Sequence, residues 1–83
     1  MLNVKVLGPG CANCMNLEEA VRRVAAAKGI EASIEKVTDY AEIMKFPILR
    51  TPGLVVNGRL VAAGRIPTDA EIGAELEGAR GRS

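Results

Sequence analysis

The chain has 83 residues, of which 48% are hydrophobic, so it can bury one core but leaves no room for a second. Eleven Lys and Arg side chains stand against ten Asp and Glu, and because the two signs are interleaved, no basic stripe favours nucleic acid. With one Phe, one Tyr, no Trp and no His, the sequence lacks aromatic stacking platforms and the commonest general base.

The first half of the chain predicts a βαβ unit. A strand is predicted over residues 2–7, where apolar side chains alternate with polar ones before a Gly-Pro-Gly turn. An amphipathic helix follows from Ala12 to Lys28, and Gly29 supplies its C-terminal cap. Residues 30–37 predict a second strand, which must return parallel to the first because a helix connects them.

The next elements are a short helix and a hairpin. The helix is predicted over residues 39–45, because Asp39 can cap it and Pro47 prevents its extension. The hairpin is predicted around Asn57-Gly58, which lies between two apolar runs and supplies the two positive φ angles of a type I′ turn.

The last helix begins with a capping box, Thr68-Asp69-Ala70-Glu71, and is predicted to end at about Glu77. We therefore expect a single domain over residues 1–78 and a frayed tail over residues 79–83, which offer nothing to bury. The order βαβαββα favours an α/β fold with a mixed four-stranded sheet flanked by helices on both faces.

Two cysteines lie where the first strand hands over to the first helix, in the motif Cys11-Ala12-Asn13-Cys14. The positive end of the helix dipole favours the thiolate of Cys11, and Cys14, about one turn inside, is placed to attack a mixed disulfide formed there. The alternatives are two packed cysteines or a structural disulfide. A disulfide across so short a loop restricts the unfolded chain by only about 2 kcal/mol, so we favour redox or metal chemistry.

Several features together resemble the thioredoxin superfamily: the CANC motif after the first strand, the βαβ half, the hairpin, and Thr51-Pro52 directly before an apolar run. The similarity is greatest to the small redox-active disulfide proteins, which are glutaredoxin-sized thioredoxins of archaea and bacteria, and it covers nearly the whole chain. It implies a thioredoxin-like fold, a nucleophilic Cys11, a resolving Cys14 and a cis peptide bond at Thr51-Pro52. It further implies thiol–disulfide exchange with protein clients and a thiol reductase, with no cofactor and no metal ion.

Three neighbouring residues are expected at the client-binding surface: Arg50, Thr51 and Pro52. A cis bond would turn the backbone of Thr51 outward to pair with an extended client, whereas a trans proline would simply begin an edge strand. Arg50 is a candidate to bind a client carboxylate or to stabilise the Cys11 thiolate; an ordinary solvated arginine is the alternative. The side chains expected in the core or at the rim of the groove are Met15, Met44 and Phe46.

The chain also departs from the family patterns. Lys5 stands where a typical thioredoxin has a buried Asp, so the sequence identifies no proton acceptor for Cys14. Where glutaredoxins carry Gly-Gly and an acidic residue, this chain has Ala62-Ala63-Gly64-Arg65, so glutathione is not the favoured partner.

Other functions use similar motifs. Soft-metal carriers with a βαββαβ fold also place Cys-x-x-Cys at a strand-to-helix junction and bind Cu(I) or Zn(II) through thiolates. Those domains finish with a strand, whereas residues 68–77 predict a helix, and Pro9 replaces their usual Met. A redox-inert adaptor would leave the cysteines unexplained. Because the apolar start of the chain is too short for a signal peptide or a membrane span, we expect a cytoplasmic protein without membrane partners. We also expect it to be a monomer.

Overall fold

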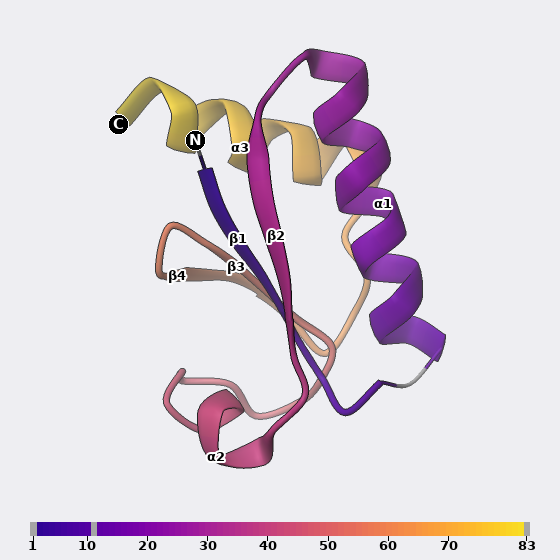
Figure 1. Ribbon diagram of the computed structural model, residues 1–83, viewed down its shortest axis with the longest axis vertical. Helices are drawn as coiled ribbons and strands as arrows, with labels where there is room; N and C mark the ends of the chain where they lie inside the picture. Colours follow the sequence, from indigo (N-terminus) through magenta and orange to yellow (C-terminus); the bar gives the residue numbers. More distant parts are fainter. Residues whose placement is uncertain (1, 11, 83) are drawn as a thin grey trace.

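The computed structural model describes residues 2–10 and 12–82. Its helices and strands follow in the order β1 (Leu2–Leu7), α1 (Ala12–Lys28), β2 (Ala32–Val37), α2 (Tyr40–Ile43), β3 (Gly53–Val56), β4 (Arg59–Ala63) and α3 (Asp69–Arg82) (Figure 1). This is the βαβαββα order predicted from the sequence.

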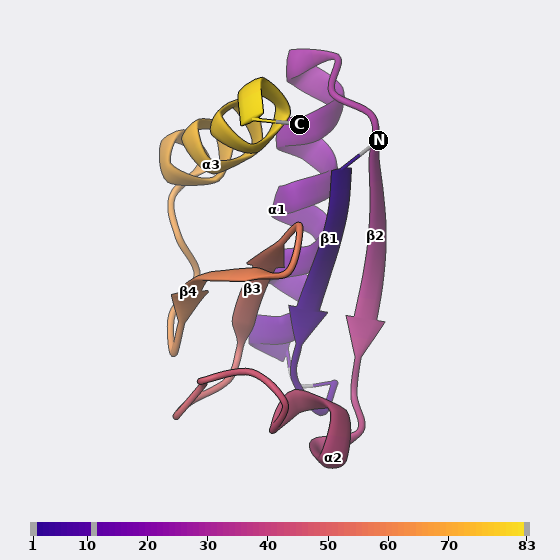
Figure 2. The ribbon, with the colours of Figure 1, turned by 90° about the vertical axis from the view of Figure 1, so that its left-hand side faces the viewer.

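The strands form a mixed four-stranded sheet in the order β2-β1-β3-β4. β1 and β2 are parallel, whereas β3 is antiparallel to both β1 and β4. Leu7 pairs with Gly53, which in turn pairs with Ala63. The last residue of β1, the first residue of β3 and the last residue of β4 therefore lie side by side at one end of the sheet. Both ribbon views place α2 near this end of the sheet and α3 near the other end (Figures 1 and 2).

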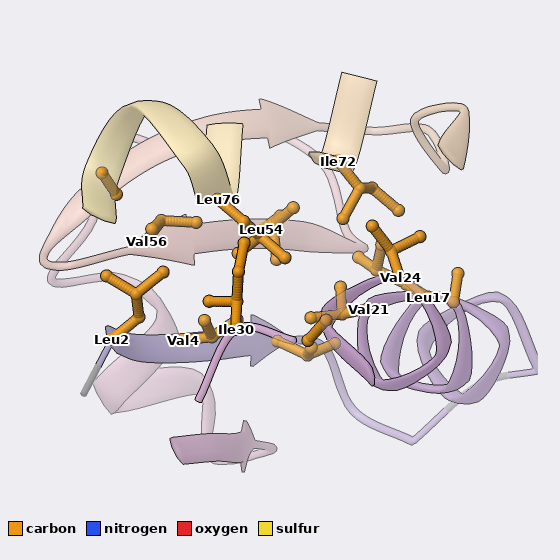
Figure 3. Packing of buried hydrophobic residues seen from close by; sticks show 14 residues of the cluster. Leu2, Val4, Leu17, Val21, Val24, Ile30, Leu54, Val56, Ile72 and Leu76 are labelled. Atoms are coloured by element: carbon orange, nitrogen blue, oxygen red, sulfur yellow. The ribbon is translucent and has the colours of Figure 1, made fainter. Parts of the chain in front are cut away.

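The larger hydrophobic cluster lies between one face of the sheet and the helices α1 and α3 (Figure 3). Alternate residues of β1 and β3 point into it, and both helices contribute side chains at helical spacing. Fully burying each of its larger side chains contributes about 1.5–3 kcal/mol. Its larger members are Leu2, Val4, Val6, Leu17, Val21, Val24, Ile30, Leu54, Val56, Ile72 and Leu76.

A smaller hydrophobic cluster covers part of the opposite face of the sheet. Its buried members are Leu7, Val37, Ile43, Ile48 and Val55. Ile43 belongs to α2 and Ile48 to the loop that follows, so α2 covers this face only near one end of the sheet. Helices therefore flank both faces, as predicted.

Local signals in the sequence produce the predicted turn and cap. Asn57 and Gly58 adopt φ angles of 51° and 82°, as a type I′ turn requires. At the start of α3, the backbone N–H of Thr68 donates to a carboxylate oxygen of Glu71 at 2.9 Å, and the N–H of Glu71 donates to the Thr68 hydroxyl at 3.2 Å. These two bonds complete the predicted capping box.

The boundaries of two elements differ from the predicted ones. β2 begins at Ala32 rather than at residue 30, because the N–H of Ile30 donates to the Ala25 carbonyl at 2.9 Å and closes the end of α1. α2 ends at Ile43 rather than at about residue 45, because the N–H groups of Lys45 and Phe46 donate to the carbonyls three residues before them and form turns instead of a further helical turn.

The third difference lies at the end of the chain. α3 continues to Arg82, past the predicted end at Glu77, and the frayed tail expected over residues 79–83 is helical as far as the structure describes it. Ala79 explains the extension, because it lies about one turn after Leu76 and is buried against the larger cluster. A single small apolar side chain was enough to continue the buried stripe.

Candidate active site

The register of the sheet brings three loop segments to one end of the sheet: the loop after β1, the loop before β3 and the loop after β4. Gly8 directly follows β1, and its N–H donates to the Val37 carbonyl at 2.9 Å, which extends the parallel ladder by one residue. Pro52 directly precedes β3, and its carbonyl accepts the N–H of Gly64 at 2.9 Å. These two bonds hold the backbone of Gly8 and of Pro52 in place. Gly8 leads into the helix that carries Cys14, and Pro52 is one of the residues expected to bind clients.

Cys14 is the third residue of α1 and is 3% exposed. A Cβ atom built on Gly8 would lie 2.1 Å from the Cys14 Sγ and 3.7 Å from the Thr51 Cβ. The sulfur therefore lies directly against the backbone of Gly8, beside Thr51, in a place that only a glycine leaves open. The predicted nucleophile, Cys11, lies outside the described residues.

The start of α1 favours negative charge on a sulfur atom. Its first turn holds no acidic residue, and its last turn carries Lys28 at the opposite pole of the dipole. The N-terminal turn also contains backbone N–H groups that have no partner within the helix. Both effects favour an anion at the start of α1.

The peptide bond between Thr51 and Pro52 is cis. Pro52 is buried, Thr51 is half-buried and Arg50 is exposed, so this segment passes from the sheet to the surface within three residues. The sequence placed these residues together at the client-binding surface, and in the structure Arg50 and Thr51 line one groove.

This groove has a volume of about 440 Å³ and lies between α2, the loop before β3 and the end of β4. Of the large hydrophobic side chains exposed in residues 2–10 and 12–81, Tyr40, Met44 and Leu49 line it, with Leu49 99% exposed. The sequence predicts Met44 in the core or at the rim of the groove, but it does not predict that Tyr40 and Leu49 line the groove as well. The residues lining the groove are Tyr40, Ile43, Met44, Ile48, Leu49, Arg50, Thr51 and Gly64.

Three other residues that the sequence singles out do not line this groove. Lys5 belongs to the sheet face opposite α1, where its Nζ lies 5.9 Å from the centre of the Phe46 ring. Phe46 packs against the smaller hydrophobic cluster. Met15 follows Cys14 on α1 and is exposed.

Among residues 2–10 and 12–82, no three His, Cys, Asp or Glu side chains are grouped in a way that could hold a metal ion. No helix among them has both the length and the apolar character that crossing a membrane requires.

Two archaeal relatives are similar to this chain over most of its length. A protein named thioredoxin from Methanothermobacter thermautotrophicus is 36% identical over 72 residues, which is 87% of this chain and 94% of that protein. Another protein named thioredoxin, from Methanocaldococcus jannaschii, is also 36% identical over 77 residues, which is 93% of this chain and 88% of that protein. These relatives support thiol–disulfide oxidoreduction as the general class of function.

The fold is similar to part of a much longer chain. A Nu-class GST from Haemonchus contortus superposes with a TM-score of 0.52 over 98% of this chain and 37% of its own, at 20% identity. That similarity concerns the fold alone. The family model described as "Thioredoxin domain" matches residues 2–77, so the chain belongs to the thioredoxin domain family.

Proposed function

We propose that this protein is a thiol–disulfide oxidoreductase that exchanges a dithiol for a disulfide with protein clients through Cys11 and Cys14. One observation carries the proposal: Cys14 is held in the first turn of α1, against Gly8 and beside Thr51, at the edge of an exposed groove.

The proposed reaction has two steps. The Cys11 thiolate attacks one sulfur of a client disulfide, which forms a mixed disulfide and expels the other client sulfur as a thiolate. The Cys14 sulfur, whose proton passes to the client thiolate expelled in the first step, then attacks the Cys11 sulfur and releases the second client sulfur as a thiolate. The client gains two electrons, the cysteine pair loses them as it becomes a disulfide, and a thiol reductase restores the dithiol.

The burial of Cys14 suits the second step. Its target is a sulfur of the same chain, so it needs contact with the mixed disulfide and no access for a visiting molecule. Lowering a thiol pKa from ~8.5 to ~7 raises the thiolate fraction about sixteenfold at neutral pH but costs about fivefold in nucleophilicity. Because that net gain is only about threefold, we assign the larger advantage to proximity.

The client would approach along the loop that precedes β3. Thr51 lies beside Cys14 and is half-buried, so its backbone is near enough to guide an extended client to the cysteine pair. Pro52 anchors this segment, because its carbonyl is bonded to Gly64. Arg50 completes the surface on the solvent side.

The test is reduction of a protein disulfide, with the chain kept reduced by a low concentration of dithiothreitol. We expect faster cleavage than dithiothreitol achieves alone, and we expect the Cys14→Ser variant to accumulate a mixed disulfide that mass spectrometry detects. Cys11→Ser should show neither activity nor adduct. Wild-type cleavage no faster than dithiothreitol alone would contradict the proposal, and stoichiometric Cu(I) binding in the same sample would then favour a metal carrier.

A further inference from the structure

The groove beside Thr51 joins an apolar surface to a positive charge. Tyr40, Met44 and Leu49 are 63%, 71% and 99% exposed, although large hydrophobic side chains usually lie in the interior. They come from α2 and from the loop before β3, and they line the same 440 Å³ groove as Arg50 and Thr51. Exposed apolar side chains that gather in one place are typical of a surface that binds a protein partner or another ligand.

Arg50 differs from Lys45 and Arg65 in its surroundings. Within the described part of the chain, no carboxylate oxygen lies within 4.0 Å of Arg50, and no aromatic ring makes a cation–π contact with it. By contrast, the nearby cations are neutralised: Lys45 pairs with Glu42 at 2.9 Å, and Arg65 pairs with Glu71 at 2.9 Å. The groove therefore has one charge that a ligand can neutralise.

Gly64 explains how the Arg50 side chain is held at the groove. A Cβ atom at Gly64 would lie 3.2 Å from the Cβ and 3.3 Å from the Cδ of Arg50. The aliphatic part of Arg50 thus lies flat on the Gly64 backbone, which restricts where the guanidinium can go. A cation whose stem is already confined loses less rotamer entropy when it binds a carboxylate.

We propose that this groove selects protein disulfides in which an apolar side chain and a carboxylate lie close to the reactive cysteine. The apolar side chain packs on Tyr40, Met44 and Leu49, and the carboxylate pairs with Arg50. Both should lie close in sequence to the client cysteine, because Arg50 directly precedes Thr51, which lies beside Cys14. This selectivity rests on the proposed function and adds a substrate class to it.

Charge argues against a second copy of the chain as the occupant. A two-fold contact centred on the groove would place the same patch of both copies face to face. It would bring two Arg50 side chains together, and among residues 2–10 and 12–82 no carboxylate lies within 4.0 Å of Arg50. An acidic client neutralises the charge that a second copy would double.

The experiment uses peptides with one cysteine, each held as a mixed disulfide with uncharged 2-mercaptoethanol. They carry Leu before the cysteine and Glu, Gln or Lys after it. We expect kcat/KM to be about two- to fivefold higher for the Glu peptide than for the Lys peptide at low salt, as for an exposed ion pair. The difference should lie in KM and should shrink at about 1 M salt.

Variants separate the two parts of the groove. Arg50→Gln should remove the preference for Glu, and Arg50→Glu should reverse it, whereas Lys45→Gln is the matched control for an exposed cation outside the groove and should keep it. Leu49→Ser should raise KM for every peptide that carries Leu, by about three- to tenfold. Lys45→Gln should reduce the small neutral disulfide of 2-mercaptoethanol at the wild-type rate. Toward that disulfide, the Arg50 and Leu49 variants should lose less activity than they lose toward the peptides.

Four results would overturn the selectivity. The first is an equal kcat/KM for the three peptides, and the second is an unchanged preference for the Glu peptide in Arg50→Gln. The third is a loss of activity toward the neutral disulfide in Arg50→Gln that is as large as its loss toward the peptides. The fourth is a wild-type dimer that Leu49→Ser dissociates, as measured by sedimentation. The third would place Arg50 at the cysteine chemistry, and the fourth would give the groove to a second copy. If the wild type reduces neither peptides nor the neutral disulfide, the proposed function itself fails.

Discussion

Replacing Gly8 with Ala tests how closely the sulfur of Cys14 is held. The new methyl group would lie 2.1 Å from the Sγ, whereas ordinary van der Waals contact begins at 3.4 Å, so the sulfur or the Gly8 backbone must move by the difference. The backbone resists, because the Gly8 N–H is bonded to the Val37 carbonyl. Its φ angle is not positive, so the cost comes from the contact and not from backbone strain.

Overpacking of this kind costs about 1–3 kcal/mol in the free energy of unfolding. A displacement of about 1 Å at a reacting atom can also cost up to about 10²-fold in rate. We therefore expect Gly8→Ala to lower the stability of the reduced protein in urea by about 1–3 kcal/mol. We also expect disulfide exchange to slow by at least about tenfold.

The control is the same substitution in a Cys14→Ala background. Without the sulfur, the closest remaining contact of the new methyl group is the residue 14 Cβ at 3.3 Å, which a small shift relieves. Gly8→Ala should then cost less than about 1 kcal/mol, so the two substitutions should show a coupling energy of about 1–2 kcal/mol. Gly73→Ala provides a second control, because its Cβ would meet only the movable end of Lys28.

Equal costs of Gly8→Ala in both backgrounds would refute this reasoning, since the methyl group would then be acting on something other than the sulfur. An unchanged exchange rate in the single variant would do the same for the functional half of the argument. Gly73→Ala should leave exchange unchanged and should raise the stability slightly, because alanine favours a helix interior more than glycine does.

Further expectations concern the capping box, the core and the hairpin. Thr68→Ala should lower the free energy of unfolding by about 1 kcal/mol, measured in urea, because it removes the N-cap acceptor of α3. Hydrogen bonds from the Arg65 guanidinium and then from the Thr68 backbone lower the pKa of Glu71 to about 2 from 4.5. The stability that this lowered pKa provides is present above the unfolded-state pKa and is lost as pH falls through about 2. Glu71→Gln should therefore be less stable than wild type at neutral pH, and the difference should shrink below about pH 4. A difference that does not depend on pH would contradict this. Leu76→Ala should cost about 2–5 kcal/mol, because Leu76 is 0% exposed. Gly58→Ala should cost about 1 kcal/mol, since φ is 82° there, whereas the same change at Gly81, which has open space around it, should not destabilise the protein.

Local patterns predicted most of the elements because the chemistry that makes them is local. The turn at Asn57-Gly58 and the capping box at Thr68 depend on residues within a few positions of each other, and both formed as expected. The ends of α2 and α3 were harder, because tertiary contacts decide them. Ala79 extends α3 only because a buried cluster lies beside it, which no local pattern records.

The candidate site likewise has some features that local sequence predicts and others that only tertiary contacts create. Its motif and the segment before β3 could be identified from the sequence because each is a short run of unusual residues. The role of Gly8 could not, since it depends on Cys14 lying directly against its backbone. Tyr40 and Leu49 also gave no signal, because they fall outside the helical and strand periodicities and meet only when α2 folds against the loop before β3.

The unequal division of the core has a consequence for motion. α2 and the loop after it are held to the sheet by the smaller cluster, to which they contribute the buried side chains Ile43 and Ile48. A segment with so few buried contacts opens without disturbing the rest of the molecule. We therefore expect the amides of α2 to exchange with deuterium well before those of α1, so that one wall of the groove can yield to clients of different shapes while the sulfur beside Gly8 stays in place.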